Sequence, residues 1–461
     1  MNKISQNQEL LQHLVALLAA FRPAFRQTRV FQRAVLLLAG EVLAFARHTV
    51  TQLLMAVGMV DGDWSGWYRL FSRERFPYEE LRGILLEETL KHVGAEDLYV
   101  VAGDATQTGR SSRKIEGVSY LPHPGTAVFA RGLRWAQRWF HGAWLIPSEE
   151  GFSRAVPLFW EPAFTEKSKS KVTVPMKEWE AAVEFLEWLK KELKRLEREG
   201  QRILMVGDGH YDQLNLWKSL PEGVILLARS ARNRALWEIP GAGDRKNRRY
   251  GERAPKPAEA WRERKGWKKM VIKVRGRERH LQVKVKGPYL RRGAFQVPLF
   301  LIVVKGKHRR EPLAFLVNGV RGAEGKWEMP LGVEELLFWA WQRWEIEVTH
   351  RELKSNFGLG EKQCWNPKGA VRSVQWSAWV YATLVLVGYR TWGLVGGPEV
   401  PTRWWRGGQR WSLNSLWRAY RAAWWGGHVF YEVTLDELLS RGDLSWLQPG
   451  LSNAAFGAAR I

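Results

Sequence analysis

The sequence predicts a mixed α/β fold in which helical regions flank a central sheet. Apolar residues recur at helical spacing through much of residues 1–95, and helical spacing resumes at about Val333. Between residues 97 and 230, short apolar runs alternate with a long charged segment of helical period. The chain has 461 residues, of which 45% are hydrophobic, so it can bury a large core. This length corresponds to about three domains, or to one enlarged domain with additions.

The strongest compositional feature is a formal net charge of +24. Such a basic surface favours a polyanionic partner, because cationic side chains attract nucleic acid and release its counterions. A ribosome-associated or merely basic soluble protein is the alternative. Cys364 is the single cysteine, which excludes an internal disulfide and a cysteine zinc cluster and fits a cytoplasmic location. Most of the 27 tryptophans are expected to pack in the core or on the surface, although aromatic faces also bind unstacked bases.

Residues 1–95 are expected to form a helical N-terminal region that contacts DNA. The apolar stretch Leu14–Phe21 lacks a secretory cleavage site and is typical of an amphipathic helix. Thr49–Gly58 and Trp64–Phe71, separated by a polar turn, have the pattern of a helix-turn-helix. Ordinary helix pairs share this pattern, so a helical bundle that only packs on the core is the alternative. Trp376–Val387 is too short and too mixed for a membrane span, and no membrane partner is expected.

The central part of the chain predicts an antiparallel three-stranded meander, followed by alternating helices and strands. The expected elements are, in order, strands at 98–104, 139–146 and 155–160, a charged helix at 176–198, a strand at 203–208, a short helix from about Tyr211 and a strand at 224–228. This is the order of a ribonuclease-H-like sheet. Residues 96–230 are therefore expected to form the first part of a ribonuclease-H-like core.

Residues 231–328 are expected to form a basic, β-rich insertion. Between residues 245 and 292 there are about 19 Lys or Arg and about 4 Asp or Glu. Residues 268–286 alternate like a β-hairpin with a turn near Gly276. Two further strands are expected at 298–304 and 314–317, and a polar loop is expected at 241–257.

The remainder of the chain is predicted to be helical. Residues 329–393 are expected to complete the core with one helix from Val333 past Lys354 and another over 370–392. Residues 394–461 form a C-terminal region, a candidate for dimerisation. Its expected features are a helix at 413–425 and an acidic stretch at Asp436-Glu437.

Three acidic residues, far apart in the sequence, are candidates for one site. Asp104 and Asp208 each end an apolar strand pattern, and Glu347 lies in a helical stretch. Sites in open α/β sheets form beyond the carboxyl ends of strands. Asp212 competes with Asp208, but Asp208 directly ends the apolar run, whereas Asp212 is placed to cap the following helix. His210 either touches substrate or orients the loop, and both interpretations stay open.

Helical geometry selects Glu347 among the glutamates of its helix. With Arg343 set at zero, Glu347 lies at about 40°, Lys354 at about 20° and Arg351 at about 80°. The glutamates on the opposite face are Glu345 and Glu352. Glu347 thus shares its face with cations that can hold phosphate oxygens. A solvated helix with salt bridges between successive turns is the alternative.

Two aspartates and a glutamate suit metal-dependent phosphodiester chemistry. Two divalent ions about 4 Å apart can activate water and stabilise the leaving oxygen. Mg²⁺ or Mn²⁺ is expected, two ions per site, because these ions prefer carboxylate oxygens. Asp104, Asp208 and Glu347 are therefore the predicted catalytic residues and metal ligands.

The residues around Glu347 carry a specific resemblance. Arg343, Glu347 and Lys354 match the Arg, three residues, Glu, six residues, Lys spacing in the signature of DDE transposases of bacterial insertion sequences. The sequence resembles the cut-and-paste group of that family, which has a β-rich insertion in a ribonuclease-H-like core. Asp104 and Asp208 fit its first two aspartates. Ala340 stands at the position of the signature tyrosine, a departure that leaves any role of that tyrosine without a counterpart.

The resemblance implies a transposase that cleaves transposon ends and joins them to target DNA. It implies double-stranded DNA as partner, a homodimer in the synaptic complex and a cytoplasmic, nucleoid-associated location. Arg343 and Lys354 would grip the DNA end. In some relatives a tryptophan of the insertion stacks on a flipped base, and Trp237, Trp261 and Trp267 are candidates here, with core packing as the alternative for each.

Two other functions fit the same residues. One is a structure-selective nuclease with this core that cuts DNA but does not join it. The other is a domesticated DNA-binding protein, which the presence of all three acids disfavours.

Overall fold

The computed structural model describes residues 3–432 except 46, 60, 124–125, 128, 131, 169, 242–247, 307–310 and 399–409. The middle of the expected polar loop at 241–257 and the acidic stretch Asp436-Glu437 lie outside the described residues. The strands are β1 Leu98–Gly109, β2 Ser119–Pro122, β3 Leu133–Leu145, β4 Ala155–Pro162, β5 Arg202–Gly207, β6 Val224–Ser230, β7 Trp237–Glu238, β8 Lys268–Val274, β9 Arg277–Arg291, β10 Ala294–Gly306, β11 Leu313–Asn318, β12 Val320–Arg321 and β13 Trp327–Glu328.

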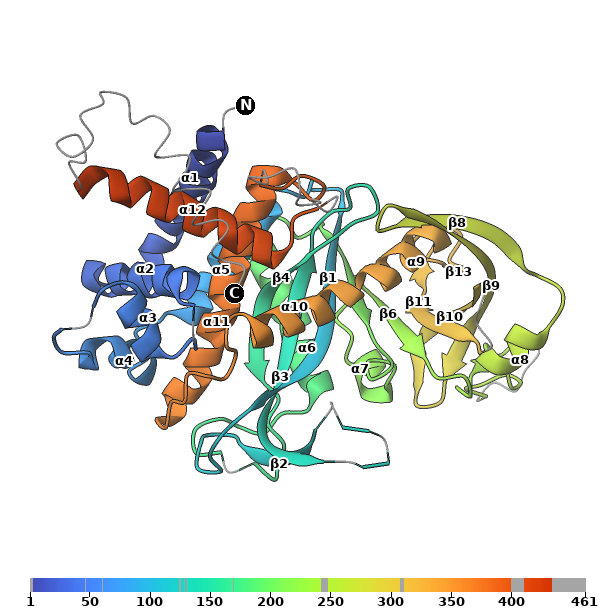
Figure 1. The fold of residues 1–461 in the computed structure, drawn as a ribbon. Helices are drawn as coiled ribbons and strands as arrows, with labels where there is room; N and C mark the ends of the chain where they lie inside the picture. Colours follow the sequence, from blue (N-terminus) through green and yellow to red (C-terminus); the bar gives the residue numbers. More distant parts are fainter. Residues whose placement is uncertain are drawn as a thin grey trace.

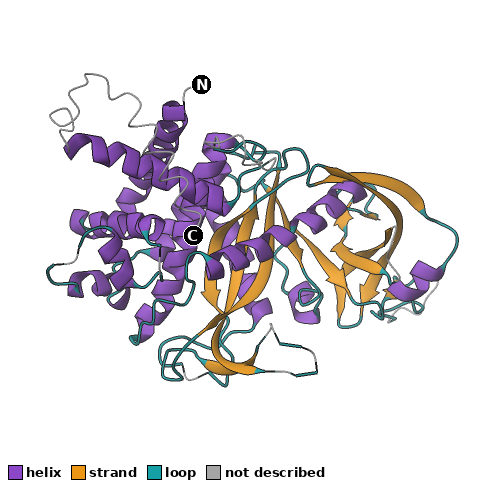
Figure 2. Ribbon diagram, viewed as in Figure 1, coloured by secondary structure: helices purple, strands orange, loops and turns teal. Residues whose placement is uncertain are grey.

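The helices gather mainly on one side of the molecule, and the strands extend to the other (Figure 2). They are α1 Lys3–Phe21, the 3₁₀ turn η1 Arg22–Ala24, α2 Thr28–Leu43, α3 Val50–Ala56, α4 Ser65–Ser72, α5 Tyr78–Leu90, α6 Glu178–Arg195, α7 Leu214–Lys218, α8 Pro257–Arg262, α9 Val333–Gln342, α10 Trp344–Ser355, α11 Pro367–Trp392 and α12 Leu413–Glu432. No helix of the described segments is long and apolar enough to cross a membrane.

The first strands form the predicted mixed sheet. β1 pairs antiparallel with β3, and β4 pairs antiparallel with the other edge of β3. On its opposite edge β1 pairs parallel with β5, which pairs parallel with β6. The resulting order, β4-β3-β1-β5-β6, is that of a ribonuclease-H-like core, and the antiparallel meander that the sequence predicted is confirmed.

The sheet continues without interruption into the basic, β-rich segment. β11 pairs antiparallel with β6 and leads through β10 to β9 (Figure 1). Within the described residues the sheet has eleven strands. β8 and β9 form the predicted hairpin, and its turn at Arg275-Gly276 has φ angles of 53° and 70°. The hairpin and the sheet of residues 98–230 are therefore parts of one hydrogen-bonded surface.

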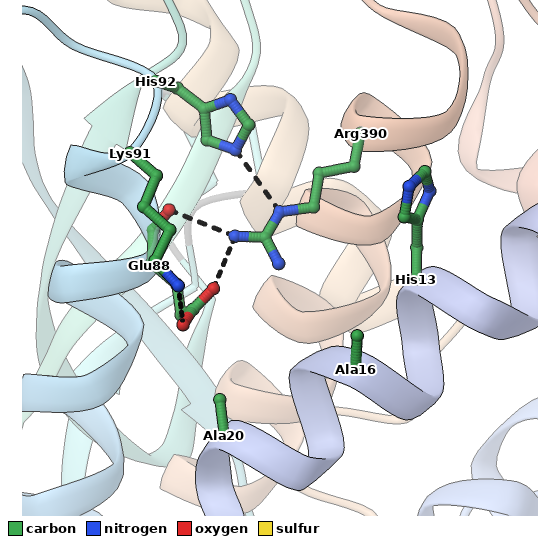
Figure 3. A pocket seen from close by; sticks show the side chains of 7 residues that line it. All are labelled: His13, Ala16, Ala20, Glu88, Lys91, His92 and Arg390. Atoms are coloured by element: carbon green, nitrogen blue, oxygen red, sulfur yellow. Dashed lines mark hydrogen bonds and ion pairs between the residues drawn. The ribbon is translucent and has the colours of Figure 1, made fainter.

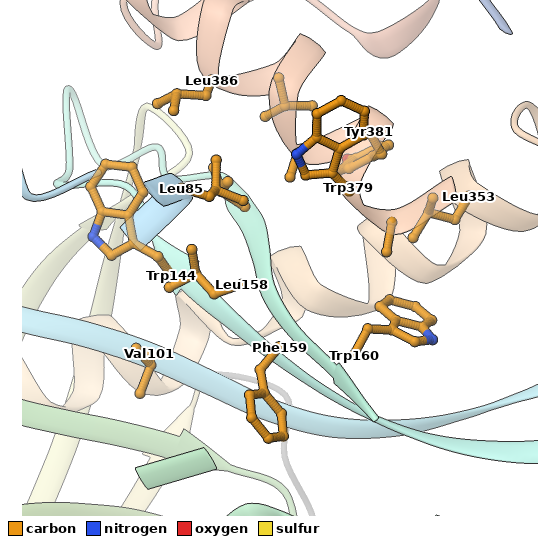
Figure 4. Close-up of a cluster of buried hydrophobic side chains, with 14 of the residues drawn as sticks. Leu85, Val101, Trp144, Leu158, Phe159, Trp160, Leu353, Trp379, Tyr381 and Leu386 are labelled. Atoms are coloured by element: carbon orange, nitrogen blue, oxygen red, sulfur yellow. The ribbon is translucent and has the colours of Figure 1, made fainter. Parts of the chain in front are cut away.

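Alternation along β1 divides the core between the two faces of the sheet. Tyr99 and Val101 belong to one buried cluster, whereas Val100 and Ala102 belong to the other. The first cluster packs against α5, α6 and α11. Figure 4 shows Val101 and Trp144 of the sheet together with Leu85 of α5 and Leu386 of α11. The indole of Trp144 stacks on Tyr99 with ring centroids 6.1 Å apart. The second cluster packs against α9 and the first turn of α10 through residues such as Ile346.

The N-terminal helices are packed around α11 and α12. In α4, the helix that would follow the turn of a helix-turn-helix, Phe71 contacts Trp376 of α11 edge-on, with ring centroids 5.8 Å apart. The buried carboxylate of Glu41 in α2 contacts Lys362 at 2.6 Å and also accepts a hydrogen bond from Trp376. These helices thus form a packed bundle, and DNA contact by α3 and α4 stays a prediction.

Several expected boundaries are corrected by the structure. β1 does not end at Asp104 but continues to Gly109, because β3 keeps pairing with it as far as Gly109 and Ala136. The expected single helix from Val333 past Lys354 is divided at Arg343 into α9 and α10. The short helix expected from Tyr211 begins at Leu214.

Candidate active site

Asp104 of β1 and Asp208, the residue after β5, follow paired residues of two neighbouring strands. The parallel pairing of β1 and β5 ends at the pair Gly103 and Gly207, and each aspartate is the next residue in its chain. Adjacent strands run about 4.8 Å apart. Gly207 is required here because a Cβ would lie 2.7 Å from the Cβ of Tyr211. The local sequence thus brings two carboxylates from distant segments to one place.

Arg343 connects the third acid to the first. Its Nη2 lies 2.5 Å from Glu347 Oε1, one turn further along, and its Nη1 lies 3.5 Å from Asp104 Oδ2. Arg343 stands at the junction of α9 and α10, so its position follows from the break between these helices. Two of the three predicted catalytic residues, Asp104 and Glu347, therefore contact one guanidinium group, and Asp208 follows the strand that pairs with β1.

The electrostatics of Asp104 reflect this crowding. Burial raises its pKa from 3.8 to about 7, although Arg343 lowers it. The negative charges of Asp208 and Glu347 raise it further, and the amide of Ala105, which donates to Oδ1, opposes them. Because the ionised form of Asp104 is disfavoured in the free protein, a cation bound beside it would stabilise that form.

The fit of this site to a divalent metal has two sides. The donors are all carboxylate oxygens, which Mg²⁺ and Mn²⁺ prefer. Burial is the main cause of the raised pKa of Asp104, and the negative charges of Asp208 and Glu347 add to it. Within the described residues, however, no three acidic, His or Cys side chains are close enough to hold an ion together. Arg343 contacts two of the carboxylates. The chemistry of the donors therefore suits a metal ion, whereas their present spacing does not, and a protein cation lies against them.

The remaining cations of α10 lie near the acids or face solvent. The pKa of Lys354 is lowered to about 8 by surrounding protein and by Arg134, while Asp104 raises it; part of the lysine surface nevertheless stays exposed. Arg351 is exposed on the same helix. Lys354 is therefore in electrostatic reach of the candidate site, as helical phasing predicted.

The opposite face of α10 is engaged in packing. Glu345 is buried and accepts hydrogen bonds from Arg275 and Arg410. Glu352 is paired with Arg154 at 2.9 Å and accepts a hydrogen bond from Tyr381. Both glutamates thus have structural roles.

Asp212 accepts hydrogen bonds from several segments of the chain and does not cap a helix. Its buried carboxylate accepts from the Trp217 indole, the Ser230 hydroxyl, Arg234 at 2.7 Å and Arg291 at 3.0 Å. Gln213 stands at the N-cap of α7 instead. Because Arg291 belongs to β9, Asp212 ties the loop after β5 to the β-rich segment.

His210 contacts Asp208 directly. Its backbone amide donates to Asp208 Oδ1 at 2.8 Å, and its ring Nδ1 lies 3.2 Å from Oδ2. The ring itself is largely exposed, so it orients the carboxylate and also faces solvent. Both roles considered for His210 remain compatible with this position.

The structure does not bring Trp261 and Trp267 to the three acids. They lie at and just after α8, at the edge of the molecule, with β6 and β11 between them and β1 (Figure 1). Lys305 Nζ lies 4.1 Å from the Trp267 ring centroid and 4.9 Å from that of Trp261. Both rings also pack against the large buried cluster, whereas base stacking by either stays a prediction.

Two cavities flank the candidate site. One of about 280 Å³ lies beside Arg343 and is lined by further cations, including Arg229 and Arg279. The other, of about 1280 Å³, extends from His210 and Tyr211 to the β2–β3 hairpin. The sequence pattern marked Tyr211 only as the start of a short helix, because its place in the lining of this cavity depends on the fold; the run Asp-Gly-His-Tyr was the available signal.

A third cavity, of about 440 Å³, lies elsewhere between α1, α5 and α11 (Figure 3). In it Arg390 pairs with Glu88 at 2.6 Å and donates to His92 at 3.3 Å. These contacts join α11 to α5. Because these side chains bind one another, the cavity is best explained as part of the packing between the helices.

The sequence comparisons agree with this geometry. A family model described as "DDE superfamily endonuclease" matches residues 20–286. The chain therefore belongs to this family, and membership implies a metal-dependent nuclease that acts on DNA. The matched segment contains Asp104 and Asp208, whereas Glu347 lies beyond it. No curated protein matches the chain.

Proposed function

We propose that this protein is a DNA transposase, which cleaves the ends of a mobile element and joins them to target DNA. The observation that carries the proposal is that Asp104 and Asp208 directly follow a residue pair of two neighbouring strands, with Glu347 linked to Asp104 through Arg343. Membership of the endonuclease family supports it. The formal charge of +24 supports double-stranded DNA as the substrate.

Each acidic residue has a role in this proposal. Asp104, Asp208 and Glu347 would hold Mg²⁺ or Mn²⁺, two ions per site. Such ions supply an activated water and stabilise the leaving oxygen of a phosphodiester. Arg343 neutralises the carboxylates of the free protein, because its guanidinium contacts Asp104 and Glu347. Arg343, Arg351 and Lys354 would hold phosphate oxygens of the DNA end, since Arg and Lys form strong charge-assisted contacts with phosphate.

Substitution of the acids tests the site. Asp104→Asn, Asp208→Asn and Glu347→Gln should each abolish Mg²⁺-dependent cleavage while DNA binding, measured by gel shift, is retained. Asp97→Asn and Glu335→Gln make the same chemical changes at exposed positions and should cleave normally. Near-normal cleavage by any of the three site variants would remove that residue from the site.

A nuclease that cuts without joining is the second candidate, since family membership implies cleavage of DNA but not strand transfer. Incubation with Mg²⁺, the element ends and a target plasmid separates the two functions. Joined products support the transposase, whereas cleaved ends without joined product support the nuclease. Inverted repeats bracketed by a short direct duplication around the gene would identify the ends to use.

A further inference from the structure

The larger of the two cavities described beside the candidate site has features that the cleavage chemistry does not use. It measures about 1280 Å³ and lies between the β2–β3 hairpin and the segments before α6 and α7. Its lining includes His210 and Tyr211, which follow Asp208 in the chain. The lining of the cavity therefore comes within two residues of Asp208 in the chain.

An exposed aromatic pair stands on the hairpin at the other end of this cavity. Tyr120 of β2 and Trp135 of β3 are cross-strand neighbours, with ring centroids 5.0 Å apart and planes inclined by 45°. Their exposed fractions are 55% and 39%, which is high for such large rings. Aromatic faces left open to solvent beside a basic site are suited to stacking on unpaired bases.

A buried hydroxyl marks the end of the cavity nearest the acids. Tyr211 is only 2% exposed, and its hydroxyl has no hydrogen-bond partner within the described residues. Burial raises the pKa of the Tyr211 hydroxyl well above its usual value, and the negative charges of Asp104, Glu178 and Asp208 raise it further. Leaving a buried hydroxyl without a partner costs free energy, so a ligand atom that reaches this group gains a favourable hydrogen bond.

The charges around the cavity favour a base over a run of phosphates. Arg138 is paired with Glu178, and Glu180 accepts from the backbone amide of Lys177. The cations Arg113 and Lys167 are exposed, but Glu166 is also exposed on the same wall. With cations and acids so mixed, stacking and hydrogen bonding have to supply the recognition.

We propose that this cavity binds an unpaired nucleotide of single-stranded DNA beside the candidate site, with Tyr120 and Trp135 stacking on the base and the Tyr211 hydroxyl forming a hydrogen bond. The proposal rests on the proposed function in that the strand is the one that the acids cleave. It assigns the strand a path along the β2–β3 hairpin.

The test is binding of a labelled ten-nucleotide oligothymidine, measured by fluorescence anisotropy in EDTA. Tyr120→Ala and Trp135→Ala should each weaken binding about fivefold or more, the change that corresponds to ~1 kcal/mol of lost stacking. Tyr211→Phe should also weaken it. Trp365→Ala removes an exposed tryptophan that does not line the cavity, and its affinity should equal that of the wild type.

Affinity for a blunt duplex of random sequence separates this site from general DNA binding. It should be unchanged in Tyr120→Ala and Trp135→Ala, which also shows that the variants are folded. Failure of the wild type to bind oligothymidine, or wild-type affinity in both aromatic variants, would overturn the proposal. Because the assay contains no metal, its result is independent of cleavage: loss of cleavage in Asp104→Asn bears on the proposed function alone.

Discussion

Replacing Asp104 with Asn should stabilise the free protein, although it should destroy activity. The pKa of Asp104 rises from 3.8 to about 7, and each pKa unit corresponds to about 1.4 kcal/mol, so the ionised carboxylate costs the folded state roughly 4 kcal/mol. Because the folded protein holds this proton more tightly than the unfolded chain, the cost develops as the pH rises from about 4 to about 7. It is fully present at pH 8.

The assay is denaturant unfolding of the wild type and Asp104→Asn in EDTA at pH 5 and pH 8. At pH 8 the variant should gain up to roughly 4 kcal/mol in the free energy of unfolding, and at pH 5 less than half of that. Added Mg²⁺ should stabilise the wild type more than the variant, because an ion that binds only the folded state raises its stability.

Asp212→Asn is the matched control, since it makes the same change in a buried aspartate with satisfied donors. Its carboxylate contacts Arg234 at 2.7 Å and Arg291 at 3.0 Å, and removal of one partner from such a cluster costs about 3 kcal/mol. Asp212→Asn should therefore destabilise the protein at both pH values. The reasoning fails if Asp104→Asn is no more stable than the wild type at pH 8, or gains equally at pH 5.

Three further substitutions probe other features. Lys354 has a pKa of about 8, so DNA affinity, measured by anisotropy titration, should fall between pH 7 and pH 9 as the amine loses its proton. The DNA affinity of Lys354→Arg should stay constant over this range, because arginine keeps its charge. Equal pH dependence of the two proteins would contradict this role. Glu41→Gln leaves buried Lys362 without its carboxylate partner and should lower the free energy of unfolding by about 3 kcal/mol, which an unchanged urea midpoint would refute. Gly151 has a φ of 78°, and an added Cβ would lie 2.7 Å from the Lys273 carbonyl oxygen. Gly151→Ala should therefore lower the free energy of unfolding by about 2 kcal/mol or more. A thermal midpoint equal to that of the wild type would show that the turn accommodates the methyl group without strain.

Local sequence patterns were sufficient for much of the fold. Asp208 follows an apolar run that is buried throughout, so the run alone located the end of β5. The β8–β9 hairpin was predictable because its alternation and its glycine turn are both encoded within about twenty residues. The phasing of Glu347 against Glu345 and Glu352 needed only the helical repeat.

Features that depend on distant contacts were not predictable in this way. β1 continues beyond Asp104 because β3 pairs with it, and nothing local distinguishes Ala105 as a strand residue. The break at Arg343 lies inside a continuous helical pattern, where the guanidinium is drawn to carboxylates on two elements. The environment of Trp267 depends on Lys305, which reaches it from β10.

The pairing of β11 with β6 has a consequence for anyone who wishes to shorten this protein. Residues 231–328 look removable in the sequence, but excising them would take β11 away from β6 and leave that strand with one unpaired edge. Val224, Ile225, Leu226 and Leu227 are all buried, so the freed edge would be apolar as well as open to pairing. Exposed edges of this kind invite aggregation. A minimal catalytic fragment would therefore need a replacement strand along β6, and not merely a short linker across the gap.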